Sequence, residues 1–411
     1  MKKLILGFLC FFILVFNSFS AQLPSNFDTA LQAEEDETAK SNSNIVLYDF
    51  GGSLTTNNIF SNSGTVEKTF DNNERLDIWF KLPLGKDKTS FFAVEGYYDF
   101  TSRTSTNNQM VVTNILDIPL FKFAFKFSSD KSNTTINLGR FLFADTTGYI
   151  FYQNIDGLFA DVNFDKSSIS FFAGYTGLIN GNSVSLFNNP YEYKTGIYTL
   201  SQGYFVASSR LAFNIFNTQF LNTEFLASID TGKLDYNKIF ATLTLNGTVT
   251  QKMFYVVQST LGMNIKSDKT EDLQISNLSK ADLSFYFDTL ESSFTVTGIF
   301  ASANGTNIKA FKPVSNLYSS IIGTNYSSFT KFGLLYTLKP IDSIFMSLGT
   351  DGVGIFEDQS TFYLAGIQWN YETKWQIVSD VYLALQVQQF IPLTEENDNY
   401  FLAGLKLEFT F

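Results

Sequence analysis

Histidine is absent from all 411 residues of the chain, and cysteine occurs once, at Cys10. Without histidine, the chain lacks the usual general base, the usual zinc ligand and the usual partner of a serine or cysteine nucleophile. Carboxylate pairs remain, such as Asp161 with Asp165, but solvated side chains on one face of a strand explain them more simply. We therefore expect no enzymatic activity, no metal site and no cofactor.

Long apolar runs are also missing, apart from Leu4 to Phe16. This run of thirteen residues is too short to cross a bilayer as a helix, which takes about 20 apolar residues. It follows two lysines and precedes residues 17–21, which supply small residues at plausible cleavage positions, and this is the layout of a secretory signal peptide. The sequence thus predicts that residues 1–20 are removed. Cys10 would be removed together with these residues, so the mature chain would have no thiol and no disulfide.

Because no later stretch approaches the length of a spanning helix, any membrane-embedded part must be a closed β-barrel. Aromatic residues make up 17% of the chain, although the mean hydropathy is only +0.02. They alternate with Ser, Thr, Asn and Asp, which is typical of strands with one lipid-facing side. The net charge falls from −11 to −13 once the two lysines of residues 1–20 are removed, which argues against nucleic-acid binding.

The stretch from Phe401 to Phe411 shows the alternation most clearly. One file is apolar and the other is mostly small or polar; the apolar file contains Phe401, Ala403, Leu405, Leu407, Phe409 and Phe411. A closing strand with terminal aromatic residues resembles that of bacterial outer-membrane β-barrels, which the barrel-assembly machinery recognises. The resemblance implies that Phe409 and Phe411 form an assembly signal.

Eighteen segments have this period of two and are predicted strands. They span residues 45–54, 74–83, 89–100, 113–128, 134–144, 157–165, 168–177, 203–215, 219–230, 238–250, 252–263, 281–289, 292–302, 329–338, 342–350, 361–371, 376–389 and 401–411. Within 113–128 the phase changes near Pro119, which predicts a β-bulge. The sequence thus predicts an all-β fold, a single antiparallel up-and-down transmembrane barrel over residues 45–411. It has about 18 strands, or 16 as the alternative.

Short and long connections alternate between these strands. Short ones such as 84–88 and 372–375 follow the even-numbered strands, and longer ones such as 55–73 and 101–112 follow the odd-numbered strands. Outer-membrane barrels have tight periplasmic turns and long extracellular loops, and an even strand count places both termini in the periplasm. A soluble β-sandwich is the alternative, but it would leave few Asp and Lys residues opposite the aromatic file. The polar residues 21–44 are a predicted flexible periplasmic segment.

Charged side chains on the predicted inner face are the candidate pore-lining residues. The basic candidates are Lys81, Lys122, Lys126, Arg140 and Arg210, and the acidic ones are Asp77, Glu95, Asp99, Asp161, Asp165, Glu224, Asp282, Asp288 and Asp380. Charged rings in a water-filled barrel tune ion selectivity. Since the acidic candidates outnumber the basic ones, we expect a mild preference for cations. The alternative is that these are ordinary lumen residues without selectivity.

Two long connections, 178–202 and 303–328, contain apolar and aromatic residues that a solvated loop would not need. Barrels of 16 to 18 strands leave an aqueous channel. These loops either fold inward and narrow that channel or pack outside as a cap that binds a partner. The sequence does not separate the two arrangements.

The block from Gly139-Arg140 through Gln153 to Gly157, and on to Ala173–Leu178, resembles a block in porin-like outer-membrane proteins of spirochaetes, particularly treponemes. The resemblance implies diffusion or uptake of small solutes and carries no catalytic residues. Within it, Arg140 resembles the pore-lining arginines of porins. The fatty-acid transporter family resembles this chain less, because its N-terminal hatch is larger than residues 21–44.

The sequence therefore predicts an outer-membrane porin or channel for small polar solutes. Its expected partners are outer-membrane lipid, the barrel-assembly machinery and the solutes, with no nucleic acid. One alternative is a surface adhesin or ligand-binding protein that uses the barrel as an anchor, and a second is a fatty-acid-type transporter of hydrophobic compounds. The solute and the oligomeric state stay open.

Overall fold

The computed structural model describes residues 48–64, 67–85, 89–106, 110–184, 186, 198–216, 218–232, 236–266, 274–306, 308–318, 320, 325–357, 361–395 and 398–411. The predicted signal peptide, residues 1–20, and the predicted leader, residues 21–44, lie outside the described residues. Both stay predictions.

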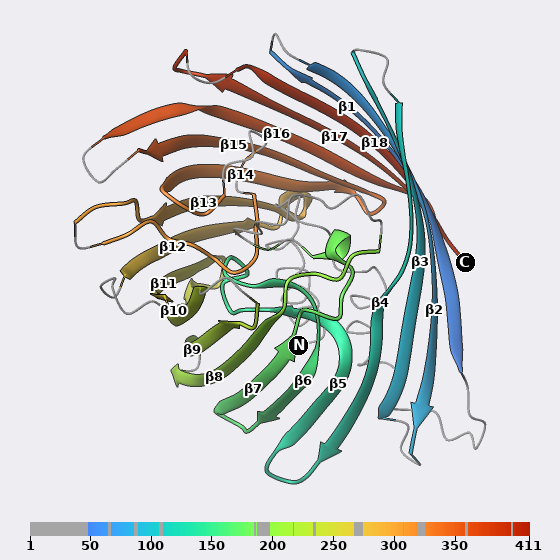
Figure 1. The fold of residues 1–411 in the computed structure, drawn as a ribbon, viewed down its shortest axis with the longest axis vertical. Coiled ribbons are helices and arrows are strands. Elements are labelled where there is room, and N and C mark those ends of the chain that lie inside the picture. Colours follow the sequence, from blue (N-terminus) through green and yellow to red (C-terminus); the bar gives the residue numbers. More distant parts are fainter. Residues whose placement is uncertain are drawn as a thin grey trace.

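Strands make up most of the described chain (Figure 1). They are β1 (Asp49–Ser63), β2 (Glu67–Leu84), β3 (Ser90–Ser105), β4 (Met110–Ser128), β5 (Asn133–Ala144), β6 (Tyr152–Asn163), β7 (Ser167–Tyr175), β8 (Tyr204–Phe216), β9 (Gln219–Asp230), β10 (Tyr236–Thr250), β11 (Met253–Lys266), β12 (Gln274–Phe287), β13 (Ser292–Ala301), β14 (Phe329–Ile341), β15 (Ile344–Phe356), β16 (Phe362–Val378), β17 (Val381–Pro392) and β18 (Tyr400–Thr410). Two short 3-10 helices, η2 (Gly181–Ser183) and η3 (Thr289–Glu291), lie in connections. In the described ranges, no helix is long and apolar enough to cross a membrane.

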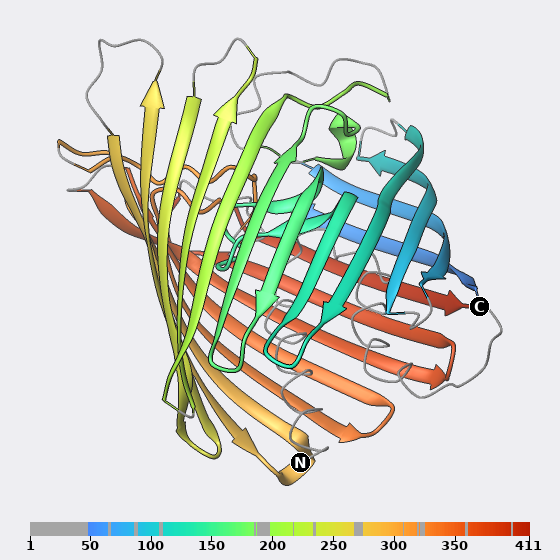
Figure 2. The same cartoon turned by 90° about the horizontal axis from the view of Figure 1, so that it is seen from below.

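The strands form one closed antiparallel sheet. Each strand pairs with its neighbours in sequence, and β1 also pairs with β18. The closing register runs from Ser53 opposite Thr410 to Ser63 opposite Tyr400. Figures 1 and 2 show the resulting cylinder from two directions. The predicted barrel of 18 strands is confirmed, and the alternative of 16 strands is wrong.

Side chains alternate between an apolar outer face and the barrel interior. On β4 the rings of Phe121 and Phe127 are exposed, whereas Lys122 and Ala124 are buried inside. On β18 the apolar file behaves in the same way, with Leu405, Leu407 and Phe409 exposed. The two faces predicted from the alternation are therefore the two faces of the barrel wall.

The predicted bulge near Pro119 is also present. Glu95 of β3 lies opposite Leu120, and Tyr97 lies opposite Asp117. Two residues of β4, Ile118 and Pro119, therefore face the single residue between them on β3, which is the definition of a β-bulge. Because of the extra residue, alternate side chains of β4 point into the barrel both before and after Pro119.

The two ends of the barrel differ. At the terminus end, β1 begins and β18 ends, and the connections between β2 and β3, β4 and β5, and the later even–odd pairs are tight turns. The opposite, loop end carries the two longest connections, 176–203 and 302–328. This difference agrees with the predicted asymmetry of the connections.

The sequence places several connections wrongly, and three of them show why. The predicted long loops 55–73 and 101–112 are mostly strand, because β1 runs to Ser63 and β3 runs to Ser105. The predicted turn at 372–375 lies inside β16, and the chain turns at 379–380 instead. Polar residues occupy both faces of the first two loop-end hairpins, which hides the period of two and makes them look like loops.

Candidate functional site

Parts of three loop-end connections fold into the barrel (Figure 1). The 145–151 loop contributes Ile150 and Phe151, the segment after β7 contributes Ile179, and the 302–328 connection contributes Phe311 and Tyr326, all of them buried. These side chains join one apolar cluster with inward residues of the wall. Of the two arrangements left open by the sequence, the described parts of both long connections thus take the inward one.

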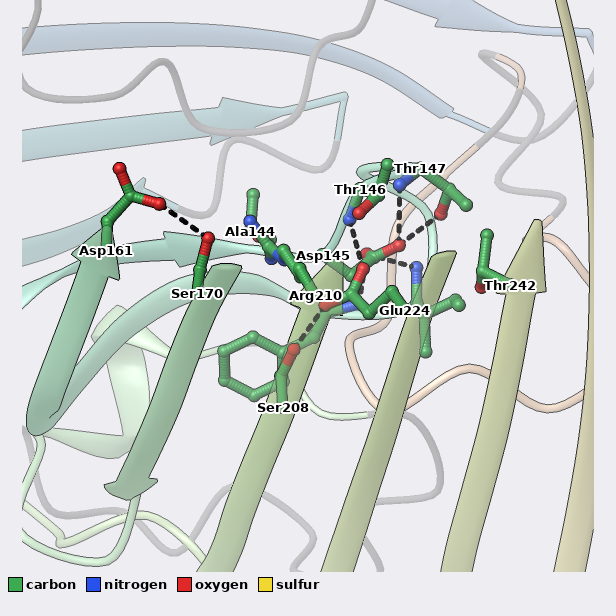
Figure 3. A network of polar contacts seen from close by, with 12 residues as sticks. Ala144, Asp145, Thr146, Thr147, Asp161, Ser170, Ser208, Arg210, Glu224 and Thr242 are labelled. Atoms are coloured by element: carbon green, nitrogen blue, oxygen red, sulfur yellow. Dashed lines mark hydrogen bonds and ion pairs between the residues drawn. The ribbon is translucent and has the colours of Figure 1, made fainter. Parts of the chain in front are cut away.

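The 145–151 loop is held in a compact turn by its own carboxylate. One oxygen of Asp145 accepts hydrogen bonds from the backbone N–H groups of Ile150 (2.9 Å) and Phe151 (2.8 Å), and the other accepts from the N–H of Thr147 (2.8 Å). The Thr147 hydroxyl donates to the same carboxylate. Figure 3 shows Asp145 and Thr147 facing each other beside the wall strands. The loop conformation thus depends on a buried side chain that is 3% exposed.

An ion pair on the wall anchors this loop. Glu224 of β9 accepts a hydrogen bond from the backbone N–H of Thr146 (2.6 Å) and pairs with Nε of Arg210 on β8 (2.8 Å). Arg210 in turn donates to the carbonyl of Ala144, and Ser208 donates to Glu224 (Figure 3). Glu224 is only 2% exposed, so breaking the pair would leave a buried charge without compensation.

The 302–328 connection is braced against the 145–151 loop and against the wall. The carbonyl of Ile150 accepts hydrogen bonds from the N–H groups of Val314 (2.8 Å) and Ser315 (2.9 Å). Lys238 of β10 donates from Nζ to the carbonyl of Pro313 (2.7 Å). The two inward connections are therefore fixed to each other and to β8, β9 and β10.

Aromatic rings add a second contact between the inward connections. Tyr149 and Tyr326 lie with ring centroids 4.5 Å apart, and Nζ of Lys280 lies 5.2 Å from the Tyr149 centroid. Burial is the largest effect that raises the pKa of Tyr149, so its hydroxyl stays neutral at physiological pH. The inward connections thus carry phenol rings of the apolar cluster, with a cation of β12 beside them.

Most inward cations have a carboxylate neighbour. The pairs are Arg75–Asp77 (2.7 Å), Arg210–Glu224 (2.8 Å), Lys280–Asp282 (2.7 Å), Lys331–Asp351 (3.1 Å), Lys374–Glu372 (3.2 Å) and Lys406–Glu408 (2.7 Å). Paired charges of opposite sign keep this inner wall polar. No three Asp or Glu side chains of the described ranges are arranged to hold a metal ion.

Ten of the predicted pore-lining residues lie on the inward rows of the strands: Asp77, Lys81, Glu95, Asp99, Lys122, Lys126, Asp161, Arg210, Glu224 and Asp282. Of these, Arg210 and Glu224 touch the 145–151 loop directly. Their role in lining a pore stays a prediction.

Three predicted residues lie outside the strands. Asp165 is in the turn between β6 and β7, Asp288 precedes η3, and Asp380 is in the turn between β16 and β17. All three are at the terminus end, away from the inward loops. The sequence misplaces them because the strand ends there lie two to five residues from the predicted bounds.

Arg140 is also misplaced, because it does not point into the barrel. It pairs in register with Phe121, whose ring is exposed on the outer face, while the next residue, Phe141, is buried inside. Its guanidinium forms a two-bond ion pair with Asp156, with both N–O distances 2.9 Å. The prediction that Arg140 lines the pore is therefore wrong.

Arg140 instead lies at a seam in the barrel wall, which is the place where the pairing of β4 with β5 ends at Phe121 and Arg140. Nη1 donates to the carbonyl of Ile118 on β4 (3.3 Å), and Nη2 donates to the carbonyl of Leu178 after β7 (3.0 Å). These contacts occur where β5 stops pairing with β4, so a side chain replaces the missing strand partner. A lipid-facing carbonyl without a partner would cost several kcal/mol, on the order of a lost buried hydrogen bond.

Sequence reasoning missed Asp145 and several inward cations, namely Arg75, Lys238, Lys280, Lys331, Lys374 and Lys406. One signal pointed to the 145–151 loop, since Tyr149-Ile150-Phe151 is too apolar for a solvated connection. Nothing in the sequence pointed to its pairing with β8 and β9, which are far along the chain.

The predicted assembly residues lie together on the outer face. The rings of Phe409 and Phe411 stack with centroids 5.9 Å apart, and both are exposed. The backbone of Phe411 exchanges two hydrogen bonds of 2.9 Å with Gly52 of β1. Recognition of these residues by the assembly machinery stays a prediction.

No protein-family model matches the sequence, and no curated protein is similar to it. Solved structures of outer-membrane proteins of Pseudomonas aeruginosa are similar in fold. OprD superposes with a TM-score of 0.59 at 10% identity, covering 91% of this chain and 95% of that one. OccK5 (OpdH) gives 0.57 at 9% identity, with 88% and 98% covered. OpdK in complex with vanillate gives 0.56 at 11% identity, with 88% and 98% covered.

The resemblance to spirochaete proteins is not tested by these similarities and stays a prediction. What they establish is the architecture, because identities near 10% carry no information about ligands. This chain has the closed antiparallel barrel of 18 strands that is found in the OprD and Occ porins.

Proposed function

We propose that the chain is an outer-membrane channel through which small polar solutes diffuse. The observation that carries the proposal is a closed barrel with a polar inner wall, narrowed by inward connections that are bonded to wall charges. The outer face, by contrast, is apolar and matches lipid. The proposal includes that residues 1–20 are an export signal. It also includes that the N-terminus and the C-terminus of the barrel face the periplasm.

The proposed selectivity is weak. Most inward cations have a carboxylate within ion-pair distance, so a permeating ion meets little net field. We expect a mild preference for cations, because acidic residues outnumber basic ones among the candidate pore-lining residues. The solute class is small and polar, because the inward connections occupy part of a barrel that would otherwise hold a wide aqueous channel.

Solute uptake by liposomes tests this proposal. Liposomes that contain the refolded protein should swell in monosaccharides and amino acids and should not swell in large oligosaccharides, because the 145–151 and 302–328 connections narrow the lumen. Reversal potentials in a salt gradient should show a small preference for cations. Folded barrels that admit none of the solutes would contradict the proposal and favour the barrel-anchored adhesin.

Channel opening should depend on pH through Asp145. Burial, and next the negative charge of Glu224, raise the pKa of Asp145 to about 6, whereas a solvated aspartate titrates near 3.9. The docked loop therefore binds the proton more tightly than the released loop, and docking is favoured below about pH 4 and weakens as the pH rises through 6. We expect lower single-channel conductance at pH 5 than at pH 7.5.

Asp145→Asn provides the control for this pH dependence, because it removes the titrating group and keeps the side-chain shape. In this variant the conductance should change little between pH 5 and pH 7.5. An equal pH dependence in the wild type and in Asp145→Asn would show that another group is responsible.

A further inference from the structure

The inner wall is more open to water on one side of the barrel than on the other. On β12 and β14, the side chains of Lys280 and Lys331 are only 10% and 11% exposed. On β2 and β16, the side chains of Arg75 and Lys374 are 32% and 39% exposed. The inner faces of β2 and β16 therefore belong to the open side of the lumen, where a solute in water meets the wall.

Asp99 of β3 lies next to this open side and has no cation beside its carboxylate. It is on the inner face of β3, directly opposite Arg75 of β2. Arg75, however, pairs with Asp77 (2.7 Å), and its guanidinium carbon lies over the Tyr97 ring, 4.0 Å from the centroid. No lysine or arginine of the described ranges lies within ion-pair distance of Asp99. The negative charge of Asp99 is therefore not cancelled, unlike that of Asp77.

Neutral donors hold the Asp99 carboxylate in place. Nδ2 of Asn73 lies 2.8 Å from each of the two carboxylate oxygens, and the Thr101 hydroxyl donates to Oδ1 (2.8 Å). Asn73 also donates to the Thr101 hydroxyl (2.8 Å). Amide and hydroxyl donors fix the direction of a carboxylate without adding a positive charge. Asp99 is thus a fixed and partly exposed negative charge on the inner wall.

Asp99 is also close to a point where an inward segment is bonded to the wall. Tyr97, two residues earlier on the same inner row, shares a hydrogen bond with the hydroxyl of Ser183 in η2 (3.2 Å). Ser183 donates in turn to the carboxylate of Asp117 on β4 (2.5 Å). Two residues along a strand span roughly 7 Å. An ion that passes η2 on its open side therefore comes near the Asp99 carboxylate.

We propose that Asp99 is the residue that determines the cation preference of the channel. The inference rests on the proposed function, because it applies only if ions cross the barrel. An uncompensated charge beside a narrowed passage favours ions of the opposite sign and disfavours ions of its own sign. Solutes with an amine or another cationic group therefore pass more readily than anions of the same size. The paired charges of Arg75 and Asp77 contribute less, because they largely cancel.

Reversal potentials in a gradient of potassium chloride test this proposal on the full-length refolded protein in a planar bilayer. The wild type should favour K⁺ over Cl⁻. Asp99→Asn keeps the shape of the side chain and should lower this permeability ratio about twofold to threefold, the effect of a unit charge about 7 Å from an ion in water. Asp99→Glu keeps the charge and should behave like the wild type, whereas Asp99→Lys should favour Cl⁻.

Asp342→Asn is the matched control, because it removes one carboxylate from the exposed turn between β14 and β15 at the terminus end. Its permeability ratio should equal that of the wild type, and faster gel migration before boiling than after shows that each variant has folded. Conducting channels whose ratio is the same in the wild type, Asp99→Asn and Asp99→Lys would overturn this proposal and leave the proposed channel intact. An equal change in Asp342→Asn would also overturn it. Folded wild-type barrels without conductance would instead overturn the proposed channel together with this inference.

Discussion

Replacing Gly139 by alanine is expected to prevent the barrel from reaching its closed, stable form. Gly139 on β5 has φ +124°, a region that side chains with a Cβ rarely adopt, and an added Cβ would lie 2.0 Å from the carbonyl oxygen of Phe121. That contact cannot relax without moving β4 away from β5. Backbone strain alone costs on the order of 1–3 kcal/mol, and the lost strand pairing adds to it.

Gel migration and thermal unfolding measure this effect. The wild-type barrel should migrate faster before boiling than after, because a closed barrel resists detergent, and Gly139→Ala should show only the slow, unfolded form. Gly298→Ala is the matched control, since an added Cβ on β13 meets nothing within 4 Å. Its stability should stay within about 0.5 kcal/mol of the wild type. A folded Gly139→Ala barrel with normal stability would contradict the structure at the seam between β4 and β5.

Replacing Glu224 by alanine is expected to release the 145–151 loop and enlarge the channel. The substitution leaves the Arg210 guanidinium and the N–H of Thr146 without their buried partner. Breaking a buried ion pair in this way costs about 3–5 kcal/mol. The docking equilibrium of the loop should therefore shift by roughly two hundredfold to five thousandfold. Because the 302–328 connection is bonded to Ile150, it should loosen as well.

Single-channel recording measures this release as larger and noisier conductance steps. Glu408→Ala is the control, because Glu408 also forms an inward ion pair, with Lys406, but on β18 near the terminus end. It should change conductance only slightly. If Glu224→Ala and Glu408→Ala behaved alike, the loop would not be held by the ion pair on β8 and β9.

The sequence is informative about the wall because each strand of the barrel has two chemically different environments. The aromatic file on β4 and the apolar file on β18 both follow the period of two, and Pro119 marks its own bulge. The period fails where neither face meets lipid. The polar hairpin tips of β1, β2 and β3 have the same composition on both sides, so they look like loops in the sequence.

Arg140 shows a second limit of the sequence. Around it, Leu138 and Leu142 on one face and Phe141 and Phe143 on the other are all apolar, so alternation does not identify the inward face. The direction of the Arg140 side chain is set at the seam, where β5 separates from β4 and loop side chains occupy the barrel interior. The inward loops themselves depend on contacts between distant segments, such as Thr146 with Glu224, which no local pattern encodes.

Planar-bilayer recording of the wild-type protein tests the central claim most directly, that this barrel is a channel narrowed by loops bonded to its wall. The predicted result is discrete conductance steps that are small for a barrel of 18 strands and that grow when Glu224 is replaced by alanine. A folded, heat-modifiable barrel that inserts into the bilayer and stays silent, in both the wild type and the variant, would contradict the claim.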